Sequence, residues 1–214
     1  SEELRWYLGI LGTATLLICI SLFPMYNNIK MLFQDVYFTT SSLMTTTGYS
    51  TVDFHQWPTF THVILLFLMF SGGMSGSTSS GFKVARIMHF AKSIKQELRR
   101  MISPERALPI VIEGKQIDDR TQRGSTFYLI TYLCVFLAIL GLISLETKSF
   151  ASAFNATIAT LNNVGHGTDL LGPAVPYSGM SVASKLLMCI SMLMGRLELY
   201  PVLLLFYPAT WRKT

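Results

Sequence analysis

Apolar stretches long enough to cross a membrane recur along the chain, separated by polar and charged segments. Four of them are predicted to form transmembrane helices: residues 6–25, 59–100, 124–145 and 181–211. The first and third contain no Asp, Glu, Lys or Arg, and each supplies the ~20 residues that cross a hydrocarbon core about 30 Å thick. Half of all residues are hydrophobic and only 14% are charged, which excludes an ordinary soluble domain. The pattern predicts an all-α membrane protein.

Two shorter segments, residues 35–50 and 150–167, are predicted to enter the membrane and return. Asp35 is suited to cap a helix that runs to Met44, after an outer loop at 27–33. A helix of ~10 residues is ~15 Å long, too short to cross the bilayer. Non-helical backbone at membrane depth must be surrounded by protein or by a water-filled pore. We therefore predict a pore helix followed by a loop in each segment.

The loops of these two segments contain related hexapeptides, Thr45–Ser50 and Asn162–Gly167. Aligning Gly48 with Gly165 gives an offset of 117 residues, and this offset also superimposes the preceding apolar helices. A glycine can adopt positive φ, so that successive carbonyl oxygens can face one axis and replace the water shell of a cation. An isolated Thr-Gly-Tyr is more often an ordinary turn. Its recurrence favours two tandem helix–pore loop–helix repeats.

Residues 71–81 interrupt the span over 59–100, which would otherwise be a helix ~60 Å long, twice the thickness of the hydrocarbon core. Ten of these eleven residues are Gly, Ser or Thr, and each Gly lowers helix stability by roughly 1 kcal/mol relative to Ala. We predict a broken helix whose flexible loop acts as a hinge or gate, followed by a second helix over 82–100. Close packing of small residues between helices is the alternative. A phosphate-binding loop is excluded, because Lys83 does not complete the Gly-Lys-Ser/Thr ending.

The net charge of +5 indicates membrane topology. Ten of the seventeen Lys and Arg residues lie between Lys83 and Arg123, and basic residues concentrate in cytoplasmic loops. Residues 101–123 are therefore predicted to be a cytosolic linker, with a small hairpin at 108–119, and both termini are predicted to be cytoplasmic. Acidic residues are interspersed among the basic ones, so we expect no binding of nucleic acid. The three cysteines lie within apolar spans and indicate buried hydrophobic residues, not disulfides.

The last span contains two charged residues, Arg196 and Glu198. A charge near the bilayer centre costs about 2.5–3.5 kcal/mol on insertion scales, so such residues usually face a pore or a partner. With the offset of 117, Arg196 corresponds to Ser79 in the Gly/Ser segment, which favours a role for Arg196 beside the gate. A structural ion pair, or an Arg that reaches the inner surface, is the alternative.

Four motifs in this order resemble the Trk/Ktr/HKT superfamily of K⁺ transporters, in its bacterial branch. The residues that carry the resemblance are Thr46-Thr47-Gly48-Tyr49, Gly72 to Lys83, Asn162-Asn163-Val164-Gly165 and Gly195 to Pro201. The resemblance implies four helix–pore loop–helix units around a central pore, with one filter glycine in each unit. Residues 1–100 and 124–214 would be the third and fourth units, the C-terminal half of such a membrane subunit.

The resemblance also implies roles for individual residues. The selectivity filter, which binds K⁺ through backbone carbonyls, would contain Thr46, Thr47, Gly48, Tyr49, Asn163, Val164, Gly165 and His166. The gate would contain Gly72, Gly73, Ser75, Gly76, Ser77, Gly81 and Arg196. The chain departs from the usual family pattern at His166, where Pro is frequent, and at Ser79-Ser80, where Gly-Gly is frequent.

The implied activity is uptake of potassium ion across the bacterial plasma (inner) membrane by a multi-pass protein, with no covalent cofactor. K⁺ would be the transported ion, with Na⁺ as the alternative. The implied partners are the remaining N-terminal repeats of the same protein, a second copy in a homodimer, a cytosolic nucleotide-binding regulatory ring subunit, and the lipid bilayer. The sequence leaves open whether transport is coupled, as in symport, or channel-like.

Two other classes of protein share features with this sequence. An intramembrane serine protease would use Gly73-Met74-Ser75-Gly76, which matches its Gly-x-Ser-Gly motif. That chemistry requires a His within hydrogen-bond reach of the Ser, and the four histidines are predicted to lie in the cytosol or near the outer surface. A structural or receptor-like membrane module would leave the paired loops unexplained. We therefore expect a transporter and no enzymatic activity.

Overall fold

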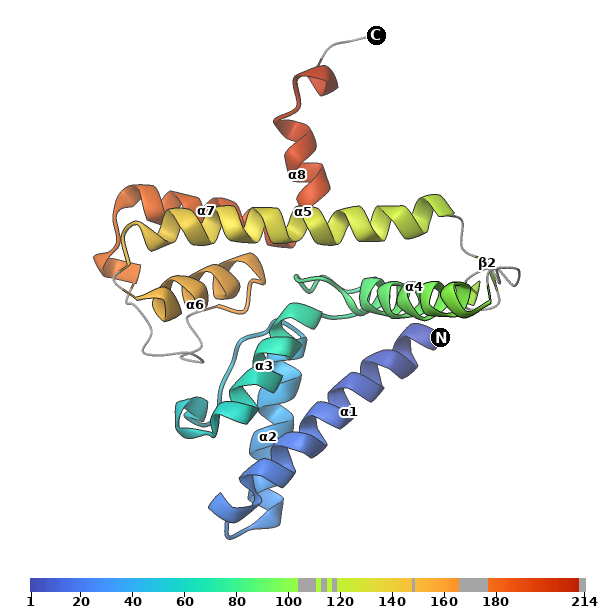
Figure 1. The fold of residues 1–214 in the computed structure, drawn as a ribbon. Coiled ribbons are helices and arrows are strands. Elements are labelled where there is room, and N and C mark those ends of the chain that lie inside the picture. Colours follow the sequence, from blue (N-terminus) through green and yellow to red (C-terminus); the bar gives the residue numbers. More distant parts are fainter. Residues whose placement is uncertain (104–110, 113–114, 117–118, 148, 166–176, 212–214) are drawn as a thin grey trace.

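The structure of the protein is a computed structural model. It describes residues 1–103, 111–112, 115–116, 119–147, 149–165 and 177–211. Helices make up most of the described chain, as the sequence predicts (Figure 1). They form two groups of three helices, one from each half of the chain, and a long helix between the groups contacts both.

The first group consists of α1 (Glu2–Leu22), α2 (Ile29–Met44) and α3 (Thr59–Ser71), each in contact with the other two. Short 3₁₀ turns at Phe23–Met25 and Phe54–Gln56 separate these helices. Thr39, Thr40 and Ser42 of α2 are buried within the group, whereas apolar side chains of α2 such as Ile29 and Phe33 are exposed. That α2 is surrounded by other helices instead of lipid stays a prediction.

The second group consists of α5 (Asp119–Ser144), α6 (Phe150–Leu161) and α7 (Val182–Arg196). The helix α6 packs against both α5 and α7, as α2 packs against both α1 and α3 in the first group. A 3₁₀ turn at Tyr177–Gly179 precedes α7. The helix α4 (Val84–Ile102) lies alongside α5 and also contacts α1, so it joins the two groups (Figure 1).

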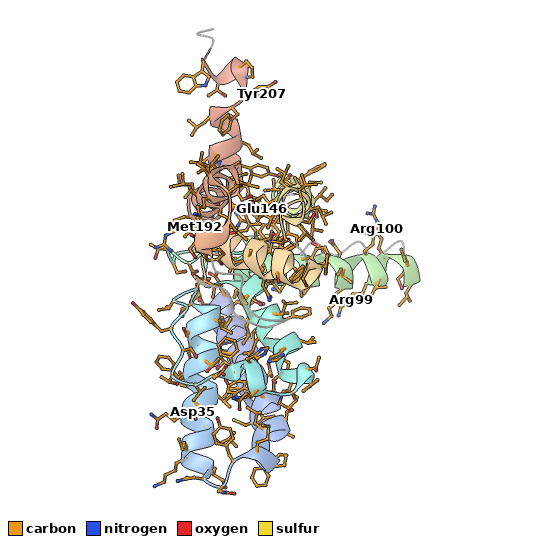
Figure 2. The ribbon with its side chains drawn as sticks, turned by 90° about the vertical axis from the view of Figure 1, so that its left-hand side faces the viewer. Asp35, Arg99, Arg100, Glu146, Met192 and Tyr207 are labelled. Carbon is orange, nitrogen blue, oxygen red and sulfur yellow. The ribbon has the colours of Figure 1, made fainter. Side chains whose placement is uncertain are left out.

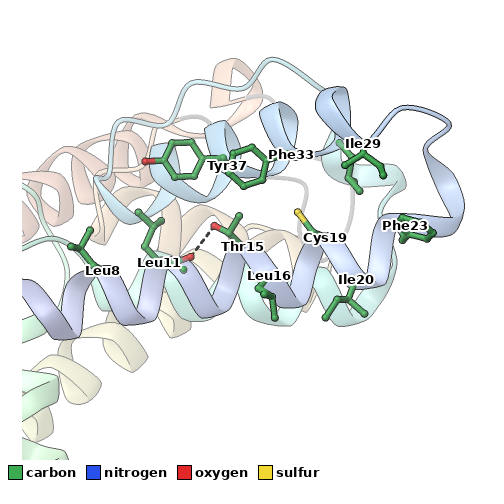
Figure 3. Close-up of a pocket in the computed structure, with 12 residues that line it drawn as sticks. Leu8, Leu11, Thr15, Leu16, Cys19, Ile20, Phe23, Ile29, Phe33 and Tyr37 are labelled. Carbon is green, nitrogen blue, oxygen red and sulfur yellow. Dashed lines mark hydrogen bonds between the residues drawn. The ribbon is translucent and has the colours of Figure 1, made fainter.

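Two helices among the described residues are long and apolar enough to cross a membrane, at Glu2–Met25 and Gly124–Ser144. Many large apolar side chains point outward, such as Leu16 on α1 and Leu137 on α5, as expected for helices that face lipid or further membrane helices. An apolar groove of about 690 Å³ between α1 and α2, with Thr15 as a polar lining residue, is one such outward surface (Figure 3).

The charged end of α4 contrasts with these apolar surfaces. Arg99 and Arg100 lie on the part of α4 that projects beyond the helical groups (Figure 2). The hairpin predicted after α4 is present as two short strands, β1 (Val111–Ile112) and β2 (Lys115–Gln116), paired antiparallel. Its Glu113-Gly114 turn lies outside the described residues.

The start of the first short helix was predicted wrongly. The helix α2 begins at Ile29, and Asn28 is its N-cap, with its side chain accepting from the N–H of Lys30 at 3.0 Å. Asp35 lies inside the helix, buried, and accepts a hydrogen bond from the Tyr26 hydroxyl at 3.2 Å. With its carboxylate held in this way, Asp35 continues the helix instead of starting it, and no extended outer loop occupies residues 27–33.

The final span is not one helix, as was predicted for 181–211. It breaks after α7, and α8 (Leu199–Leu205) then leads away from α5 and α7 (Figure 1). A 3₁₀ turn, Pro208–Trp211, follows α8. The break lies at Glu198, whose backbone φ of 65° cannot continue an α-helix. The predicted basic residues at 212–213 lie outside the described residues.

Candidate functional site

The chain after α2 and the chain after α6 adopt the same backbone geometry. We call Thr45–Ser50 the first loop and Asn162–Gly165 the second loop. In each loop the first three N–H groups donate to helix carbonyls four, three and five residues earlier. The N···O distances are 2.9, 3.2 and 2.9 Å in the first loop and 3.0, 3.2 and 3.0 Å in the second. Three hydrogen bonds thus recur at the offset of 117 residues expected from the sequence.

Left-handed backbone recurs at the same offset. Thr46 and Asn163 have φ of 57° and 52°, and Gly48 and Gly165 have φ of 77° and 103°. For a non-glycine residue this conformation is uncommon and costs of the order of 1–3 kcal/mol, so it persists only where its surroundings enforce it. Two such residues at equivalent positions indicate a constraint shared by the two loops.

The two loops also touch each other. A Cβ atom added to Gly48 would lie only 1.6 Å from the carbonyl oxygen of Val164, a backbone atom of the second loop. Only a glycine allows this approach, and its φ of 77° independently favours glycine. At Gly165 a Cβ would meet nothing within 4 Å, so φ is the constraint there. The structure therefore brings the two predicted glycine loops side by side.

The other predicted loop residues are placed less uniformly. Val164 and Thr46 are buried, whereas Thr47 is exposed and its hydroxyl bonds to that of Thr45 at 2.8 Å. The Tyr49 side chain is 72% exposed. His166 lies outside the described residues.

The predicted interruption of the second span, residues 59–100, is confirmed, because α3 ends at Ser71 and α4 begins at Val84. We call residues 72–83 the Gly/Ser loop. The two ends of the Gly/Ser loop lie side by side. The N–H of Phe82 donates to the carbonyl oxygen of Phe70, and the N–H of Val84 donates to the carbonyl oxygen of Gly73, both at 3.0 Å. The fold-back depends on tight backbone contact: a Cβ on Gly72, whose φ is 62°, would lie 2.3 Å from the carbonyl oxygen of Ser80.

The Gly/Ser loop is tied to the start of α1. The Glu3 carboxylate accepts from the backbone N–H of Ser75 at 2.6 Å and from its hydroxyl at 2.9 Å. The hydroxyl of Ser75 is thus paired with a carboxylate and not with an imidazole. This geometry does not provide the Ser–His pair that an intramembrane serine protease requires.

A hollow of about 370 Å³ lies where the first loop, α1 and the Gly/Ser loop meet. Five of its seven lining residues carry a hydroxyl group, namely Tyr7, Thr45, Ser77, Thr78 and Ser79; the other two are Gly73 and Met74. Ser77 and Ser79 belong to the Gly/Ser loop, so the hollow is formed partly by the segment predicted to act as a gate. Such a lining can hydrogen-bond water or contact a cation through oxygen atoms.

An ion-pair cluster joins the two helix breaks. Glu198 accepts from Lys83 Nζ at 2.8 Å and from Arg86 at 3.1 Å. Lys83 and Glu198 are the residues from which α4 and α8 start, and their φ values are 63° and 65°. The Arg86 guanidinium also stacks over Tyr128 of α5, 3.7 Å from the ring centroid. The cluster therefore connects α4, α5 and α8.

From the sequence, Arg196 was predicted to be the charged residue beside the gate, and no role was predicted for Lys83 or Arg86. In the described chain the Arg196 side chain is exposed, and the ion pairs of Glu198 are with Lys83 and Arg86. A signal was present in the sequence: an acidic residue within an apolar span requires a nearby cation. The role of Arg196 beside the gate stays a prediction.

A second ion pair lies where the N-terminus meets α4. Lys92 bonds to Glu2 at 2.5 Å and to the carbonyl oxygen of Val111 in the hairpin at 2.8 Å. One turn earlier on α4, burial and then the Lys92 charge lower the pKa of His89, against the opposing effect of Glu3. The start of α1 therefore contacts both the Gly/Ser loop and the charged helix α4.

A family model described as TrkH, cation transport protein, matches residues 14–213. The chain belongs to the TrkH cation transport family. This result confirms the resemblance to the Trk/Ktr/HKT superfamily that the sequence motifs indicate.

Members of the TrkH family match most or nearly all of the chain. The Trk system potassium uptake protein TrkH of Escherichia coli strain K12 is 32% identical over 214 residues, covering 99% of this chain and 44% of the relative. The E. coli protein TrkG is 36% identical over 178 residues, covering 82% of this chain and 36% of the relative. The crystal structure of the potassium transporter TrkH from Vibrio parahaemolyticus matches with a TM-score of 0.90 and 33% identity, covering 98% of this chain and 45% of that chain.

The chain thus spans less than half the length of these TrkH-family relatives. The match to a solved TrkH structure over almost all of the chain supports a mostly helical membrane transporter fold.

Proposed function

We propose that this chain forms half of the cation pore of a potassium uptake protein in the bacterial inner membrane. Residues 1–100 and 124–214 would be two consecutive helix–pore loop–helix units, and the two further units of the pore would come from the remaining N-terminal repeats. The proposal is supported by the relatives, which are named as potassium uptake proteins. K⁺ would be the transported ion, without a covalent cofactor.

The observation that carries the proposal is the pair of matching loops in contact. A selectivity filter of this kind needs backbone carbonyls from several loops around one axis. Positive φ at equivalent positions turns successive peptide groups in the same way in both loops. The contact of Gly48 with the Val164 carbonyl places the loops as neighbours, the arrangement required of two adjacent units. Residues 46–49 and 163–166 would line the filter.

The Gly/Ser loop would form the gate. It interrupts a span beside the first loop, and it lines the hydroxyl-rich hollow. Its glycines permit the tight fold-back, and the exposed Arg196 would face the ion path opposite the loop. A loop held by hydrogen bonds to α1 can leave the path without unfolding a transmembrane helix. We place Gly72, Gly73, Ser75, Gly76, Ser77 and Gly81 in this gate.

The partners and topology follow from the same proposal. Both termini and α4, with its basic end, would face the cytosol, in keeping with the distribution of Lys and Arg. A nucleotide-binding regulatory ring would act on this side, and two copies of the protein would form a homodimer.

The test is the substitution Gly48→Ser in the intact protein. The added Cβ conflicts with the Val164 carbonyl and disfavours the observed φ, so the carbonyl ring should loosen. We expect K⁺ uptake to fall and Na⁺ uptake to rise relative to it, measured in cells that lack other K⁺ uptake systems. Gly165→Ser should act in the same direction through φ alone.

The matched control is Gly9→Ser on α1, because a Cβ at Gly9 meets nothing within 4 Å. It should leave the ratio of K⁺ to Na⁺ uptake unchanged. Unaltered discrimination in both Gly48→Ser and Gly165→Ser, at normal membrane levels of protein, would remove the two loops from the filter.

A further inference from the structure

Ser80 lies at the one described position where the Gly/Ser loop bonds to both the first and second loops. Its backbone N–H donates to the Thr46 hydroxyl oxygen at 3.3 Å. Its own hydroxyl oxygen accepts from the side-chain amide of Asn163 at 3.0 Å. The residue is 1% exposed, so water does not compete for these hydrogen bonds. Thr46 and Asn163 are the equivalent residues of the two loops, and both have left-handed backbone.

The hydrogen bonds of Ser80 to Thr46 and to Asn163 differ in how much each loop depends on them. The Asn163 amide also donates to the carbonyl oxygen of Met192 on α7, at 2.8 Å. Asn163 therefore keeps one partner when Ser80 moves. The hydrogen bond described for the Thr46 hydroxyl is the one from Ser80. Displacement of the Gly/Ser loop should consequently release the first loop more than the second.

The neighbouring Ser79 bonds differently. Its hydroxyl accepts from the N–H of Gly73 at 2.9 Å and bonds to the hydroxyl of Ser77, so its contacts stay within the Gly/Ser loop. It is nearly as buried as Ser80, with 8% of its surface exposed. Two adjacent serines thus have separable roles: Ser79 holds the Gly/Ser loop together, and Ser80 connects it to the two loops.

We propose that Ser80 is a positioning residue that couples the gate to ion selectivity. While the Gly/Ser loop is in place, Ser80 holds both filter loops in their left-handed conformation. When the loop moves, the hydrogen bonds to Thr46 and Asn163 break together, and the filter loosens on the side of the first loop. This inference rests on the proposed function, because it assigns the two loops to the filter and the Gly/Ser loop to the gate.

The experiment compares Ser80→Ala with Ser79→Ala in the intact protein, by the ratio of K⁺ to Na⁺ uptake at equal membrane levels. Ser80→Ala removes the acceptor for Asn163 and keeps the N–H that bonds to Thr46. Because Asn163 keeps its hydrogen bond to Met192 and Thr46 keeps the Ser80 N–H, we expect the ratio to fall about 2-fold, the low end of the roughly 2- to 10-fold change in equilibrium that one hydrogen bond typically corresponds to. Ser79→Ala should change the total flux and leave the ratio as in the wild type.

Two further variants keep the test decisive if Ser80→Ala does not reach the membrane. Ser80→Gly removes the same hydroxyl, and Thr46→Val removes the acceptor on the opposite side with little change of shape. Each should lower the ratio. A ratio unchanged in these variants, or lowered equally by Ser79→Ala, would overturn the inference while the proposed function stands. A wild type that transports K⁺ and Na⁺ without discrimination would overturn both.

Discussion

The substitution Gly195→Ala tests how closely α7 must approach the second loop. Gly195 lies near the end of α7, where a Cβ would be 1.9 Å from the carbonyl oxygen of Leu161 and 2.8 Å from the Asn163 amide nitrogen. The nearest obstacle is backbone, which cannot rotate away as a side chain does. Because ordinary contacts begin near 3.4 Å, α7 would have to move by about 1.5 Å.

Two terms of opposite sign determine the stability change. Overpacking of a close contact costs about 1–3 kcal/mol, whereas replacing Gly by Ala within a helix returns about 1 kcal/mol. Because the obstacle is backbone, the overpacking cost should lie at the upper end of that range. We therefore expect the free energy of unfolding to fall by about 2 kcal/mol. The Asn163 amide would be displaced together with α7, and K⁺ uptake should therefore fall.

The matched control is Gly141→Ala on α5, where a Cβ would meet nothing within 4 Å. It should stabilise the protein by about 0.5–1 kcal/mol. Thermal unfolding of the intact, detergent-purified protein compares the two variants, and uptake assays accompany it. If Gly195→Ala unfolds at the same temperature as Gly141→Ala and transports K⁺ normally, the close seating of α7 on the second loop is refuted.

Two further predictions concern charged groups. Glu198→Gln should destabilise the protein by about 1–3 kcal/mol in thermal unfolding, because it leaves Lys83 and Arg86 without their counter-charge; adding Lys83→Gln should recover part of the loss, and an additive double variant would contradict the pairing. At the start of α7, hydrogen bonds from the Ser184 hydroxyl, and then from the Ser181 backbone N–H and hydroxyl, hold the pKa of Glu146 below its ordinary 4.5. The stabilisation by Glu146 is present above about pH 4.5 and is lost as the pH falls through the lower folded-state pKa. Glu146→Gln should therefore lower the melting temperature at pH 7 and converge with the wild type in acid, whereas a gap independent of pH would refute this role.

Features set by local spacing could be predicted from the sequence. Gly48 and Gly165 have positive φ at equivalent positions because their hexapeptides repeat, and a repeat is visible without a structure. The break over residues 72–83 was equally visible, because a run of Gly and Ser cannot sustain a helix. These features depend on residues close together in the chain.

Features set by distant contacts could not be predicted in this way. Asp35 was predicted to cap a helix after an outer loop at 27–33, yet α2 begins at Ile29 and Asp35 lies within it, hydrogen-bonded to the Tyr26 hydroxyl. The break at Glu198 has no glycine at the break itself, and its unusual backbone coincides with an ion pair to Lys83, 115 positions earlier. The bond of Asn163 to Ser80 likewise links residues 83 positions apart. Sequence spacing indicates which residues are polar, but tertiary packing decides which of them meet.

The most direct test of the proposed pore is to locate a bound cation. Crystals of the intact protein grown with Rb⁺ in place of K⁺ would reveal the ion by its anomalous scattering. Our account predicts an Rb⁺ peak bordered by backbone carbonyls of residues 46–48 and 163–165. Ordered Rb⁺ elsewhere in the membrane region, with none beside these two loops, would contradict it.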